Sequence, residues 1–152
     1  MVLLLALLIG IVAGLRTMTA PAVVAWAAYL NWFDPGDGWL SFMSHWITPW
    51  IFTLLALAEL VTDQLPSMPS RTVPMQFGAR ILAGALTGAT LGASGGTLVG
   101  GVLAGIAGAV IGTLGGRAIR SQLAATFGRD RSAAFLEDAI AIIGGLLIVA
   151  AT

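Results

Sequence analysis

Cysteine and lysine are absent from this chain, and charged residues of every kind are scarce. With no cysteine among the 152 residues, disulfides, thiolate nucleophiles and thiolate metal ligands are excluded. Charged residues make up 9% of the chain, whereas an ordinary soluble domain contains about 25%. The formal net charge is zero, so no overall field attracts nucleic acid. We therefore expect no nucleic-acid partner.

Enzyme signatures are missing as well. The sequence contains no His-Glu-x-x-His, no G-x-S-x-G, no P-loop and no Cys/His metal cluster. Its glycine-rich runs lack the strand-turn-helix context that phosphate binding requires. We expect a protein that is not an enzyme and that carries no cofactor.

Hydrophobic residues dominate instead, at 58% of the chain, and the mean hydropathy is +0.96. Apolar stretches of roughly 20 residues match the ~30 Å hydrocarbon layer of a bilayer. This pattern predicts an all-α fold, a polytopic membrane helix bundle in which residues 1–152 form a single integral-membrane domain.

Five apolar segments are predicted to span the membrane. The first covers residues 2–15, and it either continues in kinked form through residues 20–30 or is broken between Arg16 and Pro21. A single helix over residues 78–127 would be ~75 Å long, far more than a bilayer needs. A hairpin is therefore predicted at Ser94, Gly95 and Gly96. The other four predicted spans are 46–65, 77–93, 97–116 and 133–151.

The segments between the spans differ in charge. Residues 31–45 contain two aspartates and no arginine, whereas residues 66–80 and 117–132 contain every arginine except Arg16. By the positive-inside rule, the arginine-rich segments, and with them the N-terminus, face the cytoplasm, and the C-terminus lies outside. All five tryptophans and the only tyrosine lie between residues 26 and 50, as in an aromatic belt at the outer interface. The spacing of Trp39, Phe42, Met43 and Trp46 predicts a short interfacial helix there.

Glycines recur at helical spacing within the third and fourth predicted spans. Such a stripe lets two helix backbones approach closely, as in small-xxx-small packing in membranes. We expect a glycine-zipper hairpin of tightly packed helices, and assembly into a homo-oligomer. The predicted packing residues are Gly84, Gly88, Gly92, Gly100, Gly101, Gly105, Gly108 and Gly112.

A weak internal repeat is also present. Residues 13–16 (Ala-Gly-Leu-Arg) close the first span, and residues 114–117 (Leu-Gly-Gly-Arg) close the fourth. This suggests two units, 1–65 and 97–152, joined by the span 77–93 and inverted across the membrane as in many secondary transporters. The alternative is a chance coincidence of two Gly-Arg helix ends in a glycine-rich chain.

Charged residues in or beside the spans are the candidate functional groups. Glu59 and Asp63 are four residues apart, so both carboxylates point the same way from one helix. A charge near the bilayer centre costs about 2.5–3.5 kcal/mol on insertion scales. Charged residues in such segments are therefore expected to be paired with one another or to serve a function. Four arginines are expected to face four acids: Arg16, Arg80, Arg117 and Arg120 against Glu59, Asp63, Glu137 and Asp138.

Two interpretations of these charges stay open. The ion pairs could be structural and fix the helix register. Alternatively they form a polar site, in which Glu59 and Asp63 bind a hard cation or carry a proton, or Arg16 or Arg117 holds an anion. The proline-rich segment 66–74 cannot be helical, and its Arg71 could fold back onto Glu59 and Asp63 or contact a lipid phosphate.

Several of these motifs together resemble a known family. The chain contains Gly14-Leu15-Arg16-Thr17, then Glu59-Leu60-Val61-Thr62-Asp63 followed by Pro66-Ser67-Met68-Pro69-Ser70-Arg71, and then Leu136-Glu137-Asp138. It resembles the small bacterial integral-membrane proteins catalogued as domain of unknown function four-one-two-six. The resemblance covers nearly the whole chain and implies a multi-pass protein of the bacterial inner membrane. The positions that match the family's motifs are Arg16, Glu59, Asp63, Pro66, Pro69, Arg71, Glu137 and Asp138.

The leading hypothesis is a small transporter or channel for an ion or small charged solute. Its polar site would be formed by Glu59, Asp63, Arg16, Arg117, Glu137 and Asp138, with Arg71 and Arg80 beside them. The alternative is a non-transporting membrane scaffold or lipid-binding protein, in which the ion pairs are purely structural and the basic loops contact lipid headgroups.

Overall fold

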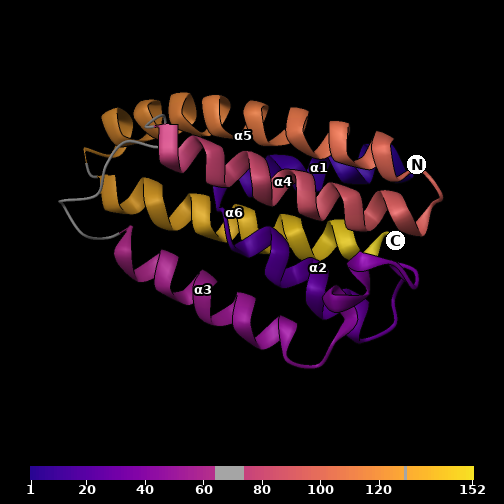
Figure 1. The fold of residues 1–152 in the computed structure, drawn as a ribbon. Helices are drawn as coiled ribbons and strands as arrows, with labels where there is room; N and C mark the ends of the chain where they lie inside the picture. The colour runs from indigo at the N-terminus through magenta and orange to yellow at the C-terminus, as the bar shows by residue number, and fades with distance from the viewer. Residues whose placement is uncertain (64–73, 129) are drawn as a thin grey trace.

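The computed structural model describes residues 1–63, 74–128 and 130–152, without the side chains of 127, 130 and 131. The regular secondary structure of the described residues is entirely helical, as predicted, with no strand. Figure 1 shows the helices packed roughly side by side. In chain order they are α1 (Val2–Leu15), α2 (Thr19–Tyr29), the 3-10 helix η1 (Trp39–Ser44), α3 (Thr48–Thr62), α4 (Pro74–Ser94), α5 (Leu98–Phe127) and α6 (Asp130–Ala150).

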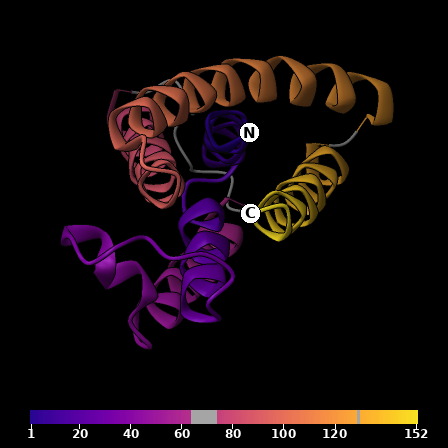
Figure 2. The same ribbon diagram turned by 90° about the vertical axis from the view of Figure 1, so that its right-hand side faces the viewer.

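Helix α1 is the centre of the bundle. Seen from the end of the bundle at which the chain begins, it is surrounded by α5, α4, α6 and α2 (Figure 2). Its sequence is apolar all round, and α2 is even more completely enclosed, since nine of its eleven residues are buried. A helix without a polar face is stable only when it is covered on all sides. The two N-terminal helices are thus the core around which the rest packs.

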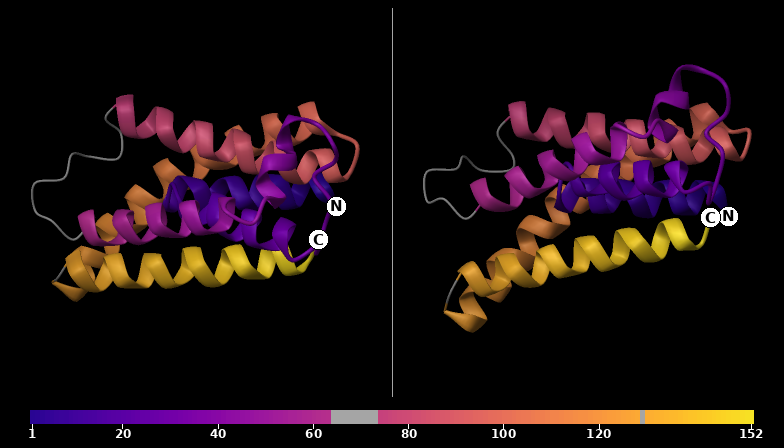
Figure 3. Two further views of the ribbon diagram at one scale, coloured as in Figure 1. Left: turned by 60° about the horizontal axis from the view of Figure 1, so that its bottom comes forward. Right: turned by 90° about the horizontal axis from the view of Figure 1, so that it is seen from below.

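The chain breaks between α1 and α2 and turns back on itself. Arg16 has extended backbone geometry, with φ −138° and ψ 114°. Pro21 lies three residues into α2, where its missing N–H needs no partner, whereas in a continuous helix it would break the ladder. The sequence was compatible with either a kinked helix through residues 2–30 or a break after residue 15. The structure has a break, after which α2 runs back toward the end of the bundle at which α1 starts (Figures 1 and 3).

This reversal bears on the predicted placement of the termini. Both chain ends lie at the same end of the bundle (Figure 3), whereas the sequence placed them on opposite sides of a membrane. The sequence treated residues 2–30 as a single pass, whereas α1 and α2 run in opposite directions along the bundle.

Helix α5 presents glycines to two neighbours. Gly101 and Gly105 face Gly84, Gly88 and Gly92 of α4, and a Cβ added at Gly92 would lie 2.7 Å from the Cα of Gly101. The hairpin between these helices is where the sequence placed it, since α4 ends at Ser94 and Gly96 adopts a positive φ of 72°.

A second set of glycines on α5 faces α1. Gly100 meets the side chain of Leu3, Gly108 meets Leu7 and Ile11, and Gly112 meets Ile11. On α1 itself, Gly10 and Gly14 approach the α5 backbone equally closely. All eight glycines predicted to pack helices therefore contact helices of the same chain.

The suggested inverted repeat does not match this arrangement. Contacts advance along both helices together, from Leu3 at Gly100 to Ile11 at Gly112, so α1 and α5 run in the same direction. Helix α5 also continues for ten residues beyond Arg117, whereas α1 stops one residue before Arg16. Helices α1 and α5 therefore do not have the opposite directions that an inverted relation between segments 1–65 and 97–152 would give them.

The helices differ in their capacity to cross a membrane. Within the described residues, two segments are long and apolar enough to do so, Leu98–Thr126 and Ser132–Ala150. Val2–Leu15 and Thr48–Thr62 are apolar but shorter, and the 14 residues of α1 extend only ~21 Å.

Candidate functional site

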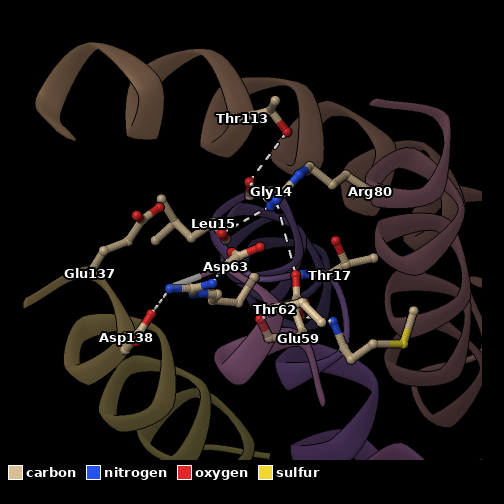
Figure 4. Close-up of polar contacts among 12 residues, drawn as sticks. Gly14, Leu15, Thr17, Glu59, Thr62, Asp63, Arg80, Thr113, Glu137 and Asp138 are labelled. Atoms are coloured by element: carbon tan, nitrogen blue, oxygen red, sulfur yellow. Dashed lines mark hydrogen bonds and ion pairs between the residues drawn. The ribbon is translucent and has the colours of Figure 1, made fainter. Parts of the chain in front are cut away.

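The break between α1 and α2 is the point at which the charged side chains converge. Helix ends leave backbone carbonyls and amides without intrahelical partners, and here two such ends meet inside the bundle. Figure 4 shows side chains from α3, α4, α5 and α6 directed at this point. Side chains from these helices hydrogen-bond the free backbone groups at each helix end.

The C-terminal carbonyls of α1 are completed from α4 and α5. Arg80 Nη1 donates to the carbonyl oxygens of Gly14 and Leu15, at 2.7 and 2.9 Å. Thr113 Oγ1 lies 3.3 Å from the same Gly14 oxygen. A cation at a helix C-terminus is also favourable for the helix dipole. Arg80 is fully buried, so its charge acts in a medium of low polarity.

The two backbone amides that lead into α2 are bound from α3. Both carboxylate oxygens of Glu59 accept a backbone hydrogen bond, from Thr17 N at 2.8 Å and from Met18 N at 2.9 Å. An anion at a helix N-terminus has the favourable sign for the dipole. Glu59 thus acts as a helix cap supplied by a residue 42 positions away in the sequence.

Arg16 itself joins two further helices. Its guanidinium pairs with Asp63 at the end of α3 and with Asp138 of α6. Arg16 has no exposed surface, and the side chains of Asp63 and Asp138 are only 14% and 12% exposed. Breaking such a buried pair is costly, because it leaves an uncompensated charge. These contacts fix the position of the break relative to α3 and α6.

The structure gives specific contacts between the arginines and acids that the sequence placed opposite each other. Glu59 lies 4.0 Å from Arg80 Nη2, and Arg120 lies 3.7 Å from Glu137. Arg16, Glu59, Asp63, Arg80 and Asp138 meet at the break, and we refer to these five residues as the charged hub. Arg120 and Glu137 form a separate contact between α5 and α6. Arg117 is an exposed residue of α5, and Arg71 lies outside the described residues.

A cleft opens beside the charged hub, between α3 and α4. Its volume is about 350 Å³, within the range of small-molecule sites. One part of its lining is polar and the rest is apolar. The polar residues are Thr17, Glu59, Thr62, Asp63, Gln76 and Arg80, and the apolar residues are Met18, Leu55, Ala58, Met75 and Ala79.

Several residues of the site were not predicted. Thr113 and Gln76 are uncharged polar residues that no sequence motif distinguishes. Only the fold places them at the site. Thr17 and Met18 contribute backbone amides, which no side-chain motif reveals. Among the described residues, no group of three or more His, Cys, Asp or Glu side chains could hold a metal ion.

The chain matches a known protein family. The family model described as Domain of unknown function (DUF4126) matches residues 3–152, essentially the whole chain, which confirms the resemblance noted from the motifs. No curated protein and no solved structure matches the chain.

Proposed function

The chain belongs to the DUF4126 family, and we infer that it is a small multi-pass membrane protein that moves an ion or small charged solute. The observation that carries this proposal is the cleft of about 350 Å³ that reaches Glu59, Asp63 and Arg80 at a helix break. In membrane proteins, non-helical backbone at depth is tolerated where it is buried in protein or lines a water-filled cavity. Transport sites are typically formed at such broken helices.

In the proposed arrangement α5 and α6 cross the membrane, since their segments are long and apolar enough. The other helices pack against them, with α1 and α2 as a re-entrant pair. Arg117 and Arg120 lie toward the end of α5, at the end of the bundle remote from both termini. By the positive-inside rule this end faces the cytoplasm. Both termini and the segment 31–45 then lie outside, and the cleft lies toward the cytoplasmic face.

A specific observation favours the alternative of a non-transporting scaffold or lipid-binding protein. Arg16 is fully buried and paired on both sides, and Glu59 already caps α2. A hub that only fixes helix positions would need the same contacts. The two functions differ in whether Glu59 is needed for anything besides folding.

Electrical recording from proteoliposomes adsorbed on a solid-supported membrane separates them. The purified full chain is challenged with gradients of H⁺, Na⁺, K⁺, phosphate, 2-phenylethylammonium and 3-phenylpropanoate. We expect a current with at least one of these solutes, and a loss of about tenfold or more in Glu59→Gln, since one charge-assisted contact contributes about 1.5–3 kcal/mol.

The matched control is Asp37→Asn, which removes an exposed carboxylate in the segment between α2 and α3. It should leave the current unchanged. Transport is contradicted if no solute produces a current, or if Glu59→Gln lowers the melting temperature and leaves the current at the wild-type level.

A further inference from the structure

We infer that the solute held in the cleft is an organic cation with an apolar body, an amphipathic amine. This inference rests on the function proposed above and names the sign and class of the solute. It is carried by three features: the charge count of the hub, the hydrogen-bonding capacity left on the cleft walls, and the division of the lining into polar and apolar parts.

The charged hub carries more negative than positive groups. Arg16 and Arg80 supply two positive charges, and Glu59, Asp63 and Asp138 supply three negative ones. Over these five described residues the formal sum is one negative charge, and unbalanced charge is costly in such a place. A monovalent cation in the adjoining cleft restores neutrality, whereas an anion would double the imbalance.

The remaining hydrogen-bonding capacity of the hub acids is that of acceptors. A carboxylate oxygen can accept about two hydrogen bonds. Each Glu59 oxygen accepts one backbone N–H, and Asp63 pairs with Arg16 through Oδ2 only. Asp63 Oδ1 has no hydrogen-bond partner among the described residues. An ammonium group, which has only donors to offer, is complementary to this set.

The rest of the lining favours a ligand with an apolar body. The cleft is about 350 Å³, against the ~30 Å³ that a water molecule occupies in the liquid. Two of its apolar lining residues, Leu55 on α3 and Met75 on α4, are also exposed at the surface. Methionines such as Met18 and Met75 adapt to irregular apolar shapes. A bare inorganic ion would use the carboxylates and leave these walls without contact.

Isothermal titration calorimetry on the full chain in lipid nanodiscs tests this inference with two probes of similar shape. We expect 2-phenylethylammonium to bind and 3-phenylpropanoate to give no measurable heat. Glu59→Gln should weaken amine binding by about tenfold to a hundredfold. Because Glu59 also caps α2, a second variant is needed that leaves every charge in place.

Ala58→Phe is that variant, since it fills the cleft from α3 and removes no polar group. It should abolish amine binding. Leu57→Phe, at an exposed residue one position away that does not line the cleft, should bind the amine like the wild type.

The outcomes separate this inference from the proposed function. Binding of 3-phenylpropanoate in place of the amine, or amine binding unaffected by Ala58→Phe, overturns the organic cation while a transport current would still support a charged solute. If neither probe binds but another solute gives a current, the inference alone fails. If neither binds and no solute gives a current, both fail.

Discussion

Replacement of Arg16 by methionine is expected to lower the free energy of unfolding by about 3–5 kcal/mol. Arg16 has no exposed surface and is the shared partner of Asp63 and Asp138. Methionine fills similar space but leaves two carboxylates facing each other without a cation. The loss should appear as a large fall in melting temperature, followed by tryptophan fluorescence of the purified chain in detergent.

A triple variant provides the control for charge. Arg16→Met combined with Asp63→Asn and Asp138→Asn removes the two stranded charges, and should recover much of the lost stability. Asp37→Asn, in an exposed segment, should change little. A melting temperature of Arg16→Met equal to that of Asp37→Asn would mean that Arg16 does not hold the break in place.

The second large effect is expected at Gly108 of α5. A Cβ added there would lie 2.8 Å from the backbone nitrogen of Ile11 and even closer to the Leu7 oxygen. Backbone atoms cannot move aside as a side-chain tip does, so α1 and α5 would have to separate. Gly108→Ala should cost about 1–3 kcal/mol, the usual range for overpacking, and Gly108→Leu should cost more.

Gly115 on the same helix supplies the control with the opposite sign. An added Cβ at Gly115 has nothing within 4 Å. Gly115→Ala should therefore stabilise the protein by up to about 1 kcal/mol, through the higher helix propensity of alanine. Equal changes in melting temperature for the two alanine variants would contradict the packing of α1 on α5.

The sequence predicted the helices better than their connections. The apolar segments correspond to α1, α3, α4, α5 and α6, because hydropathy and glycine spacing depend on each segment alone. The fourth segment was predicted to end at residue 116, where charged residues begin. Helix α5 instead runs to Phe127 and ends before Gly128, whose φ of 67° suits a helix C-terminus. Polarity marks where a helix could leave a membrane, and has less influence on where the helix ends.

The reversal at Arg16 illustrates what local patterns leave open. Residues 2–15 and 20–30 are both apolar, so hydropathy is the same for a kinked helix and for a hairpin. The reversal is stabilised by contacts from distant residues: Glu59 on the amides of α2, and Arg80 on the carbonyls of α1. The sequence identified these residues as unusual because charge is costly in apolar helices. It did not indicate that their partners are backbone groups.

The glycine contacts between helices and the polar contacts at the helix break depend on each other. Close approach of α4 and α1 to α5 brings Arg80 and Thr113 onto the same end of α1. Larger residues at these glycines would hold the helices further apart and move the donors away from the carbonyls. The glycine stripes within the chain therefore position the site, and any oligomer must use other surfaces.

A water-accessible cleft beside the helix break can be tested for directly, because the chain contains no cysteine. Ala58→Cys and Leu57→Cys each introduce a single thiol at neighbouring positions of α3. Ala58 lines the cleft, whereas Leu57 is exposed and does not line it. A membrane-impermeant maleimide reacts with thiolate, which forms in water and not in lipid. In liposomes that expose the arginine-rich end of the bundle, Ala58→Cys should be labelled and Leu57→Cys should stay unlabelled. Equal labelling of both, or labelling of Leu57→Cys alone, would contradict the cleft and the function built on it.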